Sequence, residues 1–434
     1  MATAAEAAEI VRPTDSLGLP LGPGQPPGFL HALGERDDWT ELNVYGALLG
    51  VGTELFTRSG VHLLSGFYGP FERALRDSGA EISFAPADFR RFAPLYERQC
   101  PRVMCTVASA PDADGWCSLA LHAGGSIAEL HRAAEDPDRV LVVEASSGYP
   151  RTAGLPPEYP HRIHVDHADV LIESEAAPLE LPAPDPSDAE RAIAANAAAF
   201  IASGSTVQTG IGAVPSMIAT ILAEGDYSDL GIHSEMFTDG LMELHLAGAV
   251  TNRKGVFDGV SVATFAFGTK RLYEWLDGND DVAFLPVDVV NSPETIRRNR
   301  SMVSINAALA VDVHGQVVAD TIGGRQYSGI GGSEDFAAGS GFEVEDRSLI
   351  CLPSTVEIDG ELRSRIVPAF ERGAVVTTPR HQVDVIVTEH GAAELEGKTV
   401  HQRGIELARI AHPDFRDELV EAAERASGGN SPLA

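Results

Sequence analysis

The sequence predicts an α/β fold that is divided into two domains. Short apolar runs rich in Val and Ile, such as DPDRVLVVEAS and HADVLIESE, alternate with amphipathic stretches, which is typical of buried strands between helices. The 434 residues allow two or three domains, at about 100–200 residues per domain. One segment rich in Pro and acids, from Ala176 to Glu190, interrupts the alternation and is typical of a linker. We therefore expect an N-terminal domain over residues 1–180 and a C-terminal domain over residues 186–434.

The charge of the chain argues against several classes of partner. There are 32 Lys and Arg residues against 63 Asp and Glu residues, which gives a formal net charge of −31. Such a surface repels phosphate backbones and anionic lipids, so neither nucleic acid nor a membrane surface is an expected partner. The apolar fraction of 44% and the charged fraction of 22% are close to globular averages, which argues against extensive disorder.

Cysteine usage and the lack of long apolar runs predict a cytoplasmic location. Cys100, Cys105, Cys117 and Cys351 match no zinc-binding spacing, and four thiols in so long a chain make no disulfide framework. The opening MATAAEAAEIVRP has neither the basic stretch nor the apolar stretch of a secretory signal. No apolar run reaches the roughly 20 residues that span a bilayer. We expect a soluble protein of the reducing cytosol.

Each predicted domain contains a strand, a glycine-rich loop and a helix in succession. The first of these devices runs from Ser16 to Leu33 and the second from Ser205 to Leu222, which suggests a duplication. In the second device, Gly210 and Gly212 free the backbone after an apolar strand, and Pro215 suits the first turn of a helix. Backbone N–H groups at such a helix start can hold a phosphate or an oxyanion. The alternative is an ordinary glycine turn, because the third glycine of a dinucleotide-binding fingerprint is absent.

A candidate reactive residue lies in the segment GIHSEMFTDG. A short strand is predicted to end at His233 and a helix to start near Asp239, which places Glu235 in the connecting loop. The carboxyl edge of a sheet commonly places reactive groups in such loops. A glutamate there can act as a base, a nucleophile or a metal ligand. The alternative is a solvated loop acid.

A third glycine-rich segment runs from Gln326 to Phe336. Its glycines Gly329, Gly331 and Gly332 form a loop whose amide groups can point at an anion, in the manner of a nest. The alternative is a flexible turn.

The histidine-rich segment HRIHVDHADV invites a metal-site interpretation through His161, His164, Asp166 and His167. Residues two apart on a strand share a face, so His164 and Asp166 would point opposite to His167. No metal site is therefore expected.

Several long motifs in the same order resemble one enzyme family. The motifs are VQTGIGAVP, GIHSEMFTDG, FLPVDVVNSPETI, QYSGIGG, SRIVP and VDVIVTEHGAAELEGKTVHQRGIELARIAHPDF, which run from about Val207 to Phe415. Together they resemble the acetyl-CoA hydrolase/transferase family, the class I CoA-transferases that include 4-hydroxybutyrate and acetate CoA-transferases. The first domain is similar more loosely, through SGFYGP, GWCSLAL and YPRT.

This resemblance implies a fold and a mechanism. It implies two open α/β domains of the CoA-transferase type, with acyl-CoA bound in the cleft between them. The glutamate of the family's H-[ST]-E-M motif is the nucleophile, and here that residue is Glu235. Its carboxylate would carry CoA as a glutamyl-CoA thioester in a ping-pong transfer between short-chain carboxylic acids. The residues implied to contact CoA or the oxyanion are Gln208, Gly210, Ile211, Gly212, Ala213, Val214, Gly331 and Gly332.

The resemblance also implies partners and leaves alternatives open. Coenzyme A is a substrate, so no metal and no organic cofactor are expected, and a homodimer or homotetramer is expected. An acyl-CoA hydrolase, in which water replaces the acceptor acid, is the first alternative. The second is a relative that binds acyl-CoA without turnover, although Glu235 is present.

Two departures from the family pattern concern the binding contacts. The family's GGQVDF reads GGSEDF here, so that Ser333 and Glu334 replace Gln and Val, and Glu334 is expected to point either into the cleft or to solvent. The lysine that commonly follows the Ser354-Thr355 pair is missing, because Val356 and Glu357 come next; Arg363 or Arg365 is left to supply its charge.

Overall fold

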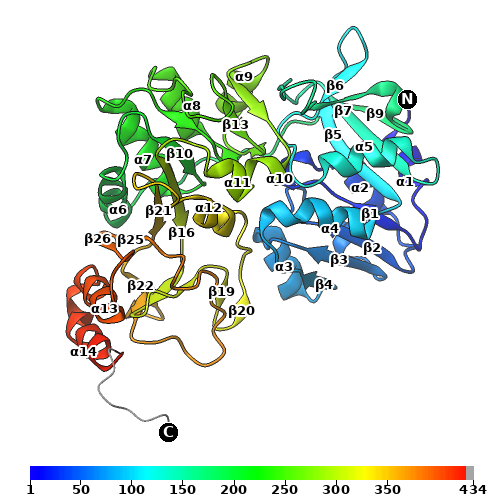
Figure 1. The fold of residues 1–434 in the computed structure, drawn as a ribbon. Coiled ribbons are helices and arrows are strands. Elements are labelled where there is room, and N and C mark those ends of the chain that lie inside the picture. Colours follow the sequence, from blue (N-terminus) through cyan, green and yellow to red (C-terminus); the bar gives the residue numbers. More distant parts are fainter. Residues whose placement is uncertain (427–434) are drawn as a thin grey trace. The chain divides into compact units, whose positions relative to one another are not determined.

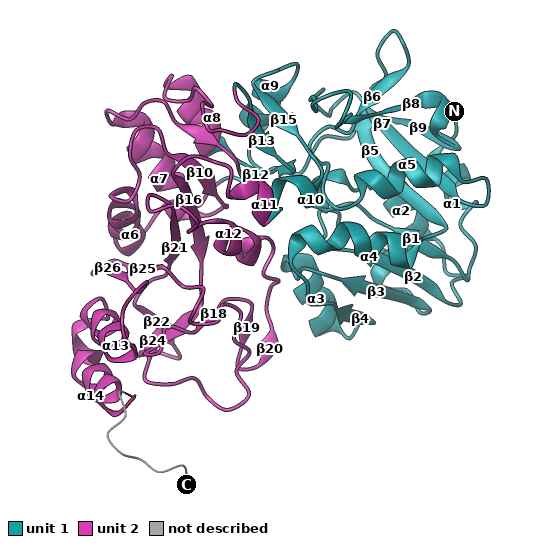
Figure 2. Cartoon of the chain, in the orientation of Figure 1, with its two compact units in different colours: residues 1–182, 234–239, 259–292 teal, residues 183–233, 240–258, 293–434 magenta. Residues whose placement is uncertain are grey.

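The structure is a computed structural model that describes residues 1–426. These residues form two compact units (Figure 2). Unit 1 contains residues 1–182, 234–239 and 259–292, and unit 2 contains residues 183–233, 240–258 and 293–426. No helix among residues 1–426 is both long enough and apolar enough to cross a membrane.

Unit 1 is built on a seven-stranded parallel sheet with the strand order β4-β3-β2-β1-β5-β7-β9 (Figure 1). The predicted strands in VMCTVAS, VLVVEAS and VLIES are β5, β7 and β9, and every residue of β5 is buried, as expected of a central parallel strand. The strands of the sheet are β1 (Ser16–Gly18), β2 (Leu42–Gly46), β3 (Val61–Ser65), β4 (Ile82–Phe84), β5 (Val103–Ser109), β7 (Val140–Ser146) and β9 (Val170–Ser174).

The helices of unit 1 begin and end at local sequence signals. Pro70 occupies the first turn of α3 (Pro70–Ser78), and Gly79 ends that helix in the left-handed region with a φ of +87°. The main core of the unit includes Phe29 and Leu30 of α2 packed with strand residues such as Val103. The remaining helices are α1 (Ala4–Ala8), α2 (Pro27–Glu35), α4 (Phe92–Gln99), α5 (Ile127–Glu135), α9 (Lys270–Leu276) and α10 (Val287–Val290).

Two later segments of the chain complete unit 1. Strands β13 (Ser261–Ala263) and β15 (Val282–Phe284) pair in parallel, as do β12 (Met236–Phe237) and β14 (Phe265–Ala266). Bridges join these strands to the first part of the chain, from His122 to Phe265 and from Ala153 to Ala283. A shorter antiparallel pair, β6 (Trp116–Ser118) with β8 (Arg162–His164), also belongs to this unit.

The units therefore differ from the predicted domains in one respect. Residues 175–187 contain no helix or strand, and the chain passes from unit 1 to unit 2 within them, after residue 182. Residues 234–239 and 259–292, however, group with unit 1, because their strands pair with one another and with the first part of the chain. Glu235 thus lies in unit 1 and not, as predicted, in the domain that follows the linker.

Unit 2 contains a six-stranded sheet with the order β11-β10-β16-β21-β25-β26, in which only β26 is antiparallel to its neighbour. The carboxyl ends of the other five strands therefore meet at one edge. The strands of this sheet are β10 (Thr206–Thr209), β11 (Gly231–Ile232), β16 (Met302–Ala307), β21 (Arg347–Cys351), β25 (Val385–Thr388) and β26 (Gly391–Glu394).

Helices and short hairpins surround this second sheet. Ser187 and Glu190 form a capping box at the start of α6. The helices are α6 (Asp188–Ala198), α7 (Ala213–Glu224), α8 (Asp239–Leu246), α11 (Pro293–Ile296), α12 (Ser333–Gly339), α13 (Val400–Arg409) and α14 (Arg416–Ala426). The smaller strands are β17 (Ala310–Asp312), β18 (Val317–Val318), β19 (Thr321–Ile322), β20 (Arg325–Gln326), β22 (Thr355–Ile358), β23 (Glu361–Ser364) and β24 (Ile366–Val367).

Candidate active site

The backbone around Glu235 is fixed on both sides. Strand β11 ends at Ile232, one residue before the predicted end, and Glu235 lies directly before β12. The N–H of Ser234 donates to the carbonyl of Val262 at 3.0 Å, and the carbonyl of Glu235 accepts from the N–H of Thr264 at 2.9 Å. The predicted loop position is confirmed, but the loop is short and held by hydrogen bonds to β13 and to Thr264, the residue that follows it.

The Glu235 side chain is half-buried and is oriented by Asn291. The Nδ2 of Asn291 donates to Oε2 of Glu235 at 2.7 Å. Asn291 is fully buried at the end of α10, where its N–H donates to the carbonyl of Val287 at 2.8 Å. An amide donor fixes the direction of a carboxylate without neutralising its charge, so the group stays available as a nucleophile.

The second glycine loop, in unit 2, is open. It follows β10 and leads into α7, where Gly212 is the N-cap with a φ of +116° and no side chain caps the helix. A Cβ atom added at Gly210 or Gly212 would meet no atom within 4 Å, and Ile211 is 49% exposed. The two glycine positions before α7 thus have open space beside them, and an open helix start of this kind suits the binding of an anionic group.

The first glycine loop, in unit 1, is filled by neighbouring side chains of the same unit. Gly22, Pro23 and Gly24 are buried, and a Cβ atom on Gly24 would lie 2.3 Å from the ring of His122. The N–H of Phe29, in the first turn of α2, donates to the carboxylate of the fully buried Glu144 at 3.0 Å. In unit 1 the Glu144 carboxylate therefore accepts from the start of α2, whereas in unit 2 the corresponding loop at Gly210 and Gly212 has open space beside it.

Gln208 is engaged in the sheet. It is 4% exposed, and its Oε1 accepts from the N–H of Ile305 at 3.1 Å, which ties β10 to β16. Ala213 is buried and Val214 is half-buried in the first turn of α7. The role of these residues in CoA binding stays a prediction.

The third glycine loop precedes α12, where Gly331 has a φ of +55° and Gly332 is the N-cap. Glu334, in the first turn of α12, accepts a hydrogen bond from the hydroxyl of Thr378. The expectation that Glu334 points into the cleft or to solvent stays a prediction, and the carboxylate is held through this contact by a buried threonine of the same unit. Sequence reasoning missed it because Thr378 is 44 residues further along the chain.

His233 connects two of the predicted elements of unit 2. Its N–H donates to the carbonyl of Val207 in β10 at 3.2 Å, and its ring meets the ring of Phe336 in α12 edge-on, with centroids 6.2 Å apart. The amide of Asn299 lies 3.1 Å from the His233 Nδ1. The strand before the second glycine loop and the helix after the third are thereby brought together.

Comparison with known proteins identifies the family. Residues 268–423 match the acetyl-CoA hydrolase/transferase C-terminal domain. The 4-hydroxybutyrate coenzyme A transferase of Clostridium kluyveri is 36% identical over 410 residues, which are 90% of this chain and 92% of that protein. The succinyl-CoA:cyclohexane-1-carboxylate CoA transferase of Geobacter metallireducens is 36% identical over 431 residues, 97% of this chain and 94% of that protein. The chain belongs to the acetyl-CoA hydrolase/transferase family.

A solved structure of a relative agrees with this assignment. RipA from Yersinia pestis matches with a TM-score of 0.89 and 32% identity, over 98% of this chain and 97% of that chain. The predicted family and the predicted α/β fold with parallel sheets are confirmed, and the protein is an enzyme of the CoA-transferase type.

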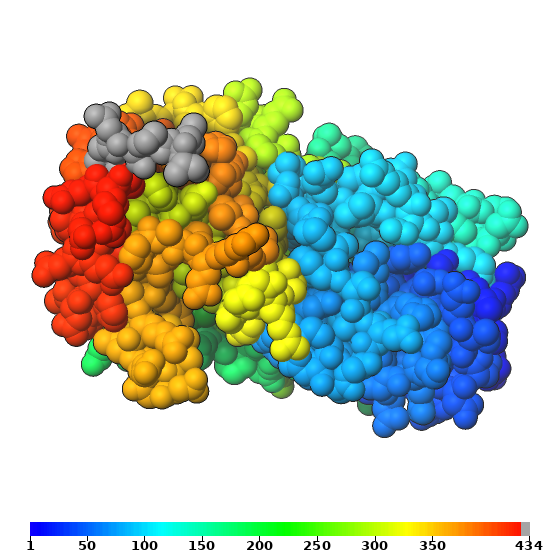
Figure 3. All heavy atoms as spheres, turned by 90° about the horizontal axis from the view of Figure 1, so that it is seen from below, coloured from blue at the N-terminus to red at the C-terminus, as the bar shows by residue number. Residues whose placement is uncertain are grey.

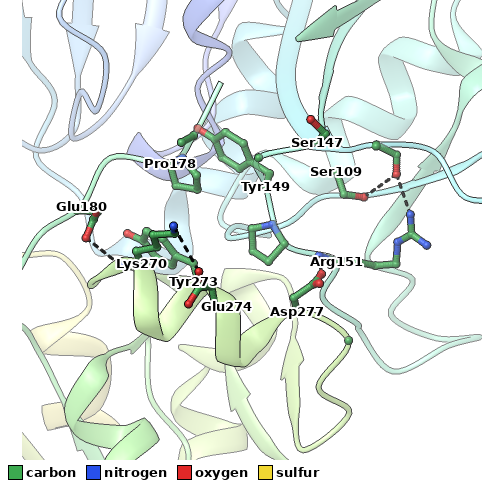
Figure 4. Close-up of a pocket in the computed structure, with 15 residues that line it drawn as sticks. Ser109, Ser147, Tyr149, Arg151, Pro178, Glu180, Lys270, Tyr273, Glu274 and Asp277 are labelled. Atoms are coloured by element: carbon green, nitrogen blue, oxygen red, sulfur yellow. Dashed lines mark hydrogen bonds and ion pairs between the residues drawn. The ribbon is translucent and has the colours of Figure 1, made fainter. Parts of the chain in front are cut away.

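The protein also has a cavity of about 640 Å³ in unit 1 that contains none of the predicted site residues (Figure 4). It lies beyond the carboxyl ends of β5 and β7 and is bordered by α9. Its charged side chains are of mixed sign: Arg151 donates to the carbonyl of Ala110, and Lys270 lies 3.5 Å from Glu274. This mixture gives no preference for an anionic ligand.

The histidine-rich segment HRIHVDHADV is not one continuous strand. Strand β8 ends at His164, and Val165–His167 form a 3₁₀ turn. The rings of His164 and His167 therefore lie 6.0 Å apart, so the prediction that they point to opposite faces is wrong. The ring of His161 is buried and stacks on Phe284.

Proposed function

We propose that the protein moves CoA between short-chain carboxylic acids through a covalent glutamyl-CoA thioester on Glu235. The observation that carries this proposal is the Glu235 carboxylate, half-buried in a short fixed loop and oriented by the Asn291 amide at 2.7 Å. Family membership supports it, because the relatives are named as CoA-transferases.

The proposed reaction has two half-reactions. An oxygen of the Glu235 carboxylate attacks the thioester carbonyl carbon, the C–S bond breaks, and CoA thiolate leaves a mixed anhydride behind. The thiolate then attacks the glutamyl carbonyl, which releases the first acid and leaves the glutamyl-CoA thioester. An incoming carboxylate runs the same steps in reverse and leaves as the new acyl-CoA, which restores the Glu235 carboxylate. No metal or organic cofactor is needed, because the energy of the thioester passes from acid to acid.

The fixed loop supports this chemistry for a physical reason. A carboxylate is a weak nucleophile, so holding it in one geometry matters; such positioning supplies up to roughly 7–11 kcal/mol of a barrier. Oxyanions and phosphates need preformed N–H donors, and the open start of α7 beyond Gly210 and Gly212 offers them.

The proposed setting of the enzyme is the cytoplasm, with a homodimer or homotetramer as the working form. Cys100, Cys105, Cys117 and Cys351 are all free, as in a reducing compartment. The oligomer rests on the family resemblance and is tested by light scattering during gel filtration.

The covalent mechanism is tested by Glu235→Gln. The amide keeps the shape but cannot form the anhydride, so transfer should fall by several orders of magnitude while circular dichroism and CoA affinity stay close to wild type. In the wild type, acyl-CoA without an acceptor should place CoA on the peptide from Gly231 to Arg253, where hydroxylamine removes it. A variant that keeps more than about a tenth of the wild-type rate, or a label on another peptide, contradicts the role of Glu235.

Hydrolysis is the competing function, because the family whose C-terminal domain matches includes acetyl-CoA hydrolases as well as transferases. A panel of short acyl-CoAs with acetate separates the two. New acyl-CoA identifies a transferase, whereas free thiol alone identifies a hydrolase.

A further inference from the structure

Arg365 lies at the carboxyl edge of the unit 2 sheet. It is the residue between β23 and β24, and its backbone is held on both sides. Its N–H donates to the carbonyl of Ser354, just after β21, at 2.8 Å, and its carbonyl accepts from the N–H of Val311 at 2.9 Å. These two backbone hydrogen bonds fix the position from which the Arg365 side chain starts.

The guanidinium of Arg365 has no hydrogen-bond or ion-pair partner among residues 1–426. The side chain is half-buried, and its Nε is fully buried. An arginine does not give up its proton in a protein, so this is a partly desolvated cation that no carboxylate of the described residues contacts by a hydrogen bond or ion pair. Buried polar groups are nearly always paired, which makes such a cation a candidate for binding an anion from outside the chain.

The neighbouring acid does not supply the missing partner. Burial lowers the pKa of Arg365, and the charge of Glu389 offsets this effect in part. Both oxygens of Glu389 are directed at Ser354, accepting from its N–H at 2.8 Å and from its hydroxyl at 2.5 Å. Glu389 therefore orients the Ser354 loop and leaves the N–H groups of the guanidinium to another acceptor.

The edge itself is the one that carries the open glycine loop. Strands β10, β16 and β21 are parallel neighbours, so the loop at Gly210–Gly212 and the Ser354 turn leave the sheet at the same edge. The strands β10 and β21 that lead into them are two strand spacings apart, which is about 10 Å. Ligands of open α/β sheets bind outside the carboxyl ends of the strands.

The other arginine of this hairpin is a different case. Arg363 is exposed in β23 and pairs with Glu361 at 3.3 Å. The hairpin is exposed over residues 357–363, and the orange part of the chain that contains it lies on the face shown in Figure 3. Of the two arginines that the sequence leaves open, the structure gives an unsatisfied guanidinium to Arg365 alone.

We propose that the Arg365 guanidinium binds a phosphate group of coenzyme A, an inference that rests on the proposed function. A phosphate offers three acceptor oxygens and a full negative charge, which match the planar fork of N–H donors in arginine. An acceptor carboxylate has part of the same chemistry, and the experiment separates the two sources.

The test measures binding to the full chain by titration calorimetry, with CoA, 3′-dephospho-CoA and pantetheine as probes. Arg365→Gln should raise the Kd for CoA by about 10- to 100-fold, because it removes a charged hydrogen-bonded contact. Pantetheine, which has no phosphate, should bind both proteins equally. Arg365→Lys should recover part of the affinity, and Arg363→Gln, the matched control on the same hairpin, should bind CoA as the wild type does. Comparison with 3′-dephospho-CoA shows which phosphate is bound.

Several results would overturn the inference. Equal CoA affinity in wild type and Arg365→Gln would do so, as would an equal loss of affinity for CoA and pantetheine, which would indicate a structural role. A rise in the KM for acetate with unchanged CoA affinity would assign the guanidinium to the acceptor. A wild-type protein that binds no CoA would instead refute the proposed function itself, and this inference with it. Circular dichroism of both Arg365 variants checks that they are folded.

Discussion

Asn291 is the residue that the structure adds to the predicted site. Its amide reaches Glu235 from the far end of α10, 56 positions along the chain. The motif FLPVDVVNSPETI contains it, but nothing in the spacing of that motif shows which residue it touches.

We expect Asn291→Ala to lower kcat by about 10- to 100-fold, because an unoriented carboxylate spends less time in the reactive geometry. Asn291→Asp should lower kcat further than Asn291→Ala does. A second carboxylate beside Glu235 favours a proton shared between the two acids, so the rate should rise only at a higher pH than in the wild type. Rate–pH profiles of the three proteins check both statements. A profile of Asn291→Asp that superimposes on the wild type would exclude an effect on Glu235.

The hydrogen bond between Glu334 and Thr378 predicts that Glu334 contributes to the stability of the fold. Its carboxylate holds Thr378, so Glu334→Val should lower the free energy of unfolding by about 1 kcal/mol. Thr378→Val should do the same, and the double variant should lose less than the sum, as for two groups in direct contact. Urea unfolding of the three variants measures the coupling. Additive losses would show that the hydrogen bond contributes nothing.

At the scale of elements, the glycine loop before α7 can be tested at its two glycines, both of which have open space beside them. Gly212 has a φ of +116°, a backbone conformation in which a residue with a side chain is strained, while Gly210 has no such restriction. Gly212→Ala should therefore cost about 1–3 kcal/mol of local strain and weaken acyl-CoA binding. Gly210→Ala should leave the fold unchanged and reduce binding only if a ligand approaches the loop. CoA titrations with melting temperatures distinguish the two, and unchanged CoA affinity in both variants would remove the loop from the binding site.

What the sequence predicts well is local. The strands β5, β7 and β9, the loop before α7 and the position of Glu235 follow from residues that are close together in the chain. Contacts between distant segments were not predictable: Glu144 at the start of α2, Gln208 with Ile305, and Glu334 with Thr378 each join residues that are 44 or more positions apart. The turn at Val165–His167 was missed because strand alternation was extended beyond the strand.

At the scale of the whole molecule, two buried histidines predict sensitivity to acid. Burial and the nearby His161 lower the pKa of His122 to about 3, and burial lowers the pKa of His161 to about 4. Histidines of the unfolded chain titrate near 6.5. Both groups thus contribute stability above that pH, and it is lost as the pH falls from about 6.5 toward 4, at about 1.4 kcal/mol per pH unit for each histidine.

Urea midpoints between pH 7 and pH 5 measure this loss. His161→Gln removes one titrating group, so its stability should depend less steeply on pH than that of the wild type, whatever its stability at pH 7. Parallel slopes in the two proteins would show that His161 takes up no proton on unfolding.

The return of the chain to unit 1 has a consequence for how the protein is made. A ribosome delivers residues 1–182 first, but the partners of His122, Ala153 and His161 lie in residues 265–284. The first unit is therefore complete only when residue 292 has been made, 110 residues after the end of its first segment at residue 182. At about 5–20 residues per second that delay is roughly 5–20 s, during which one side of the nascent unit is uncovered. A gene cut at the linker would accordingly yield an N-terminal product that lacks part of its own core.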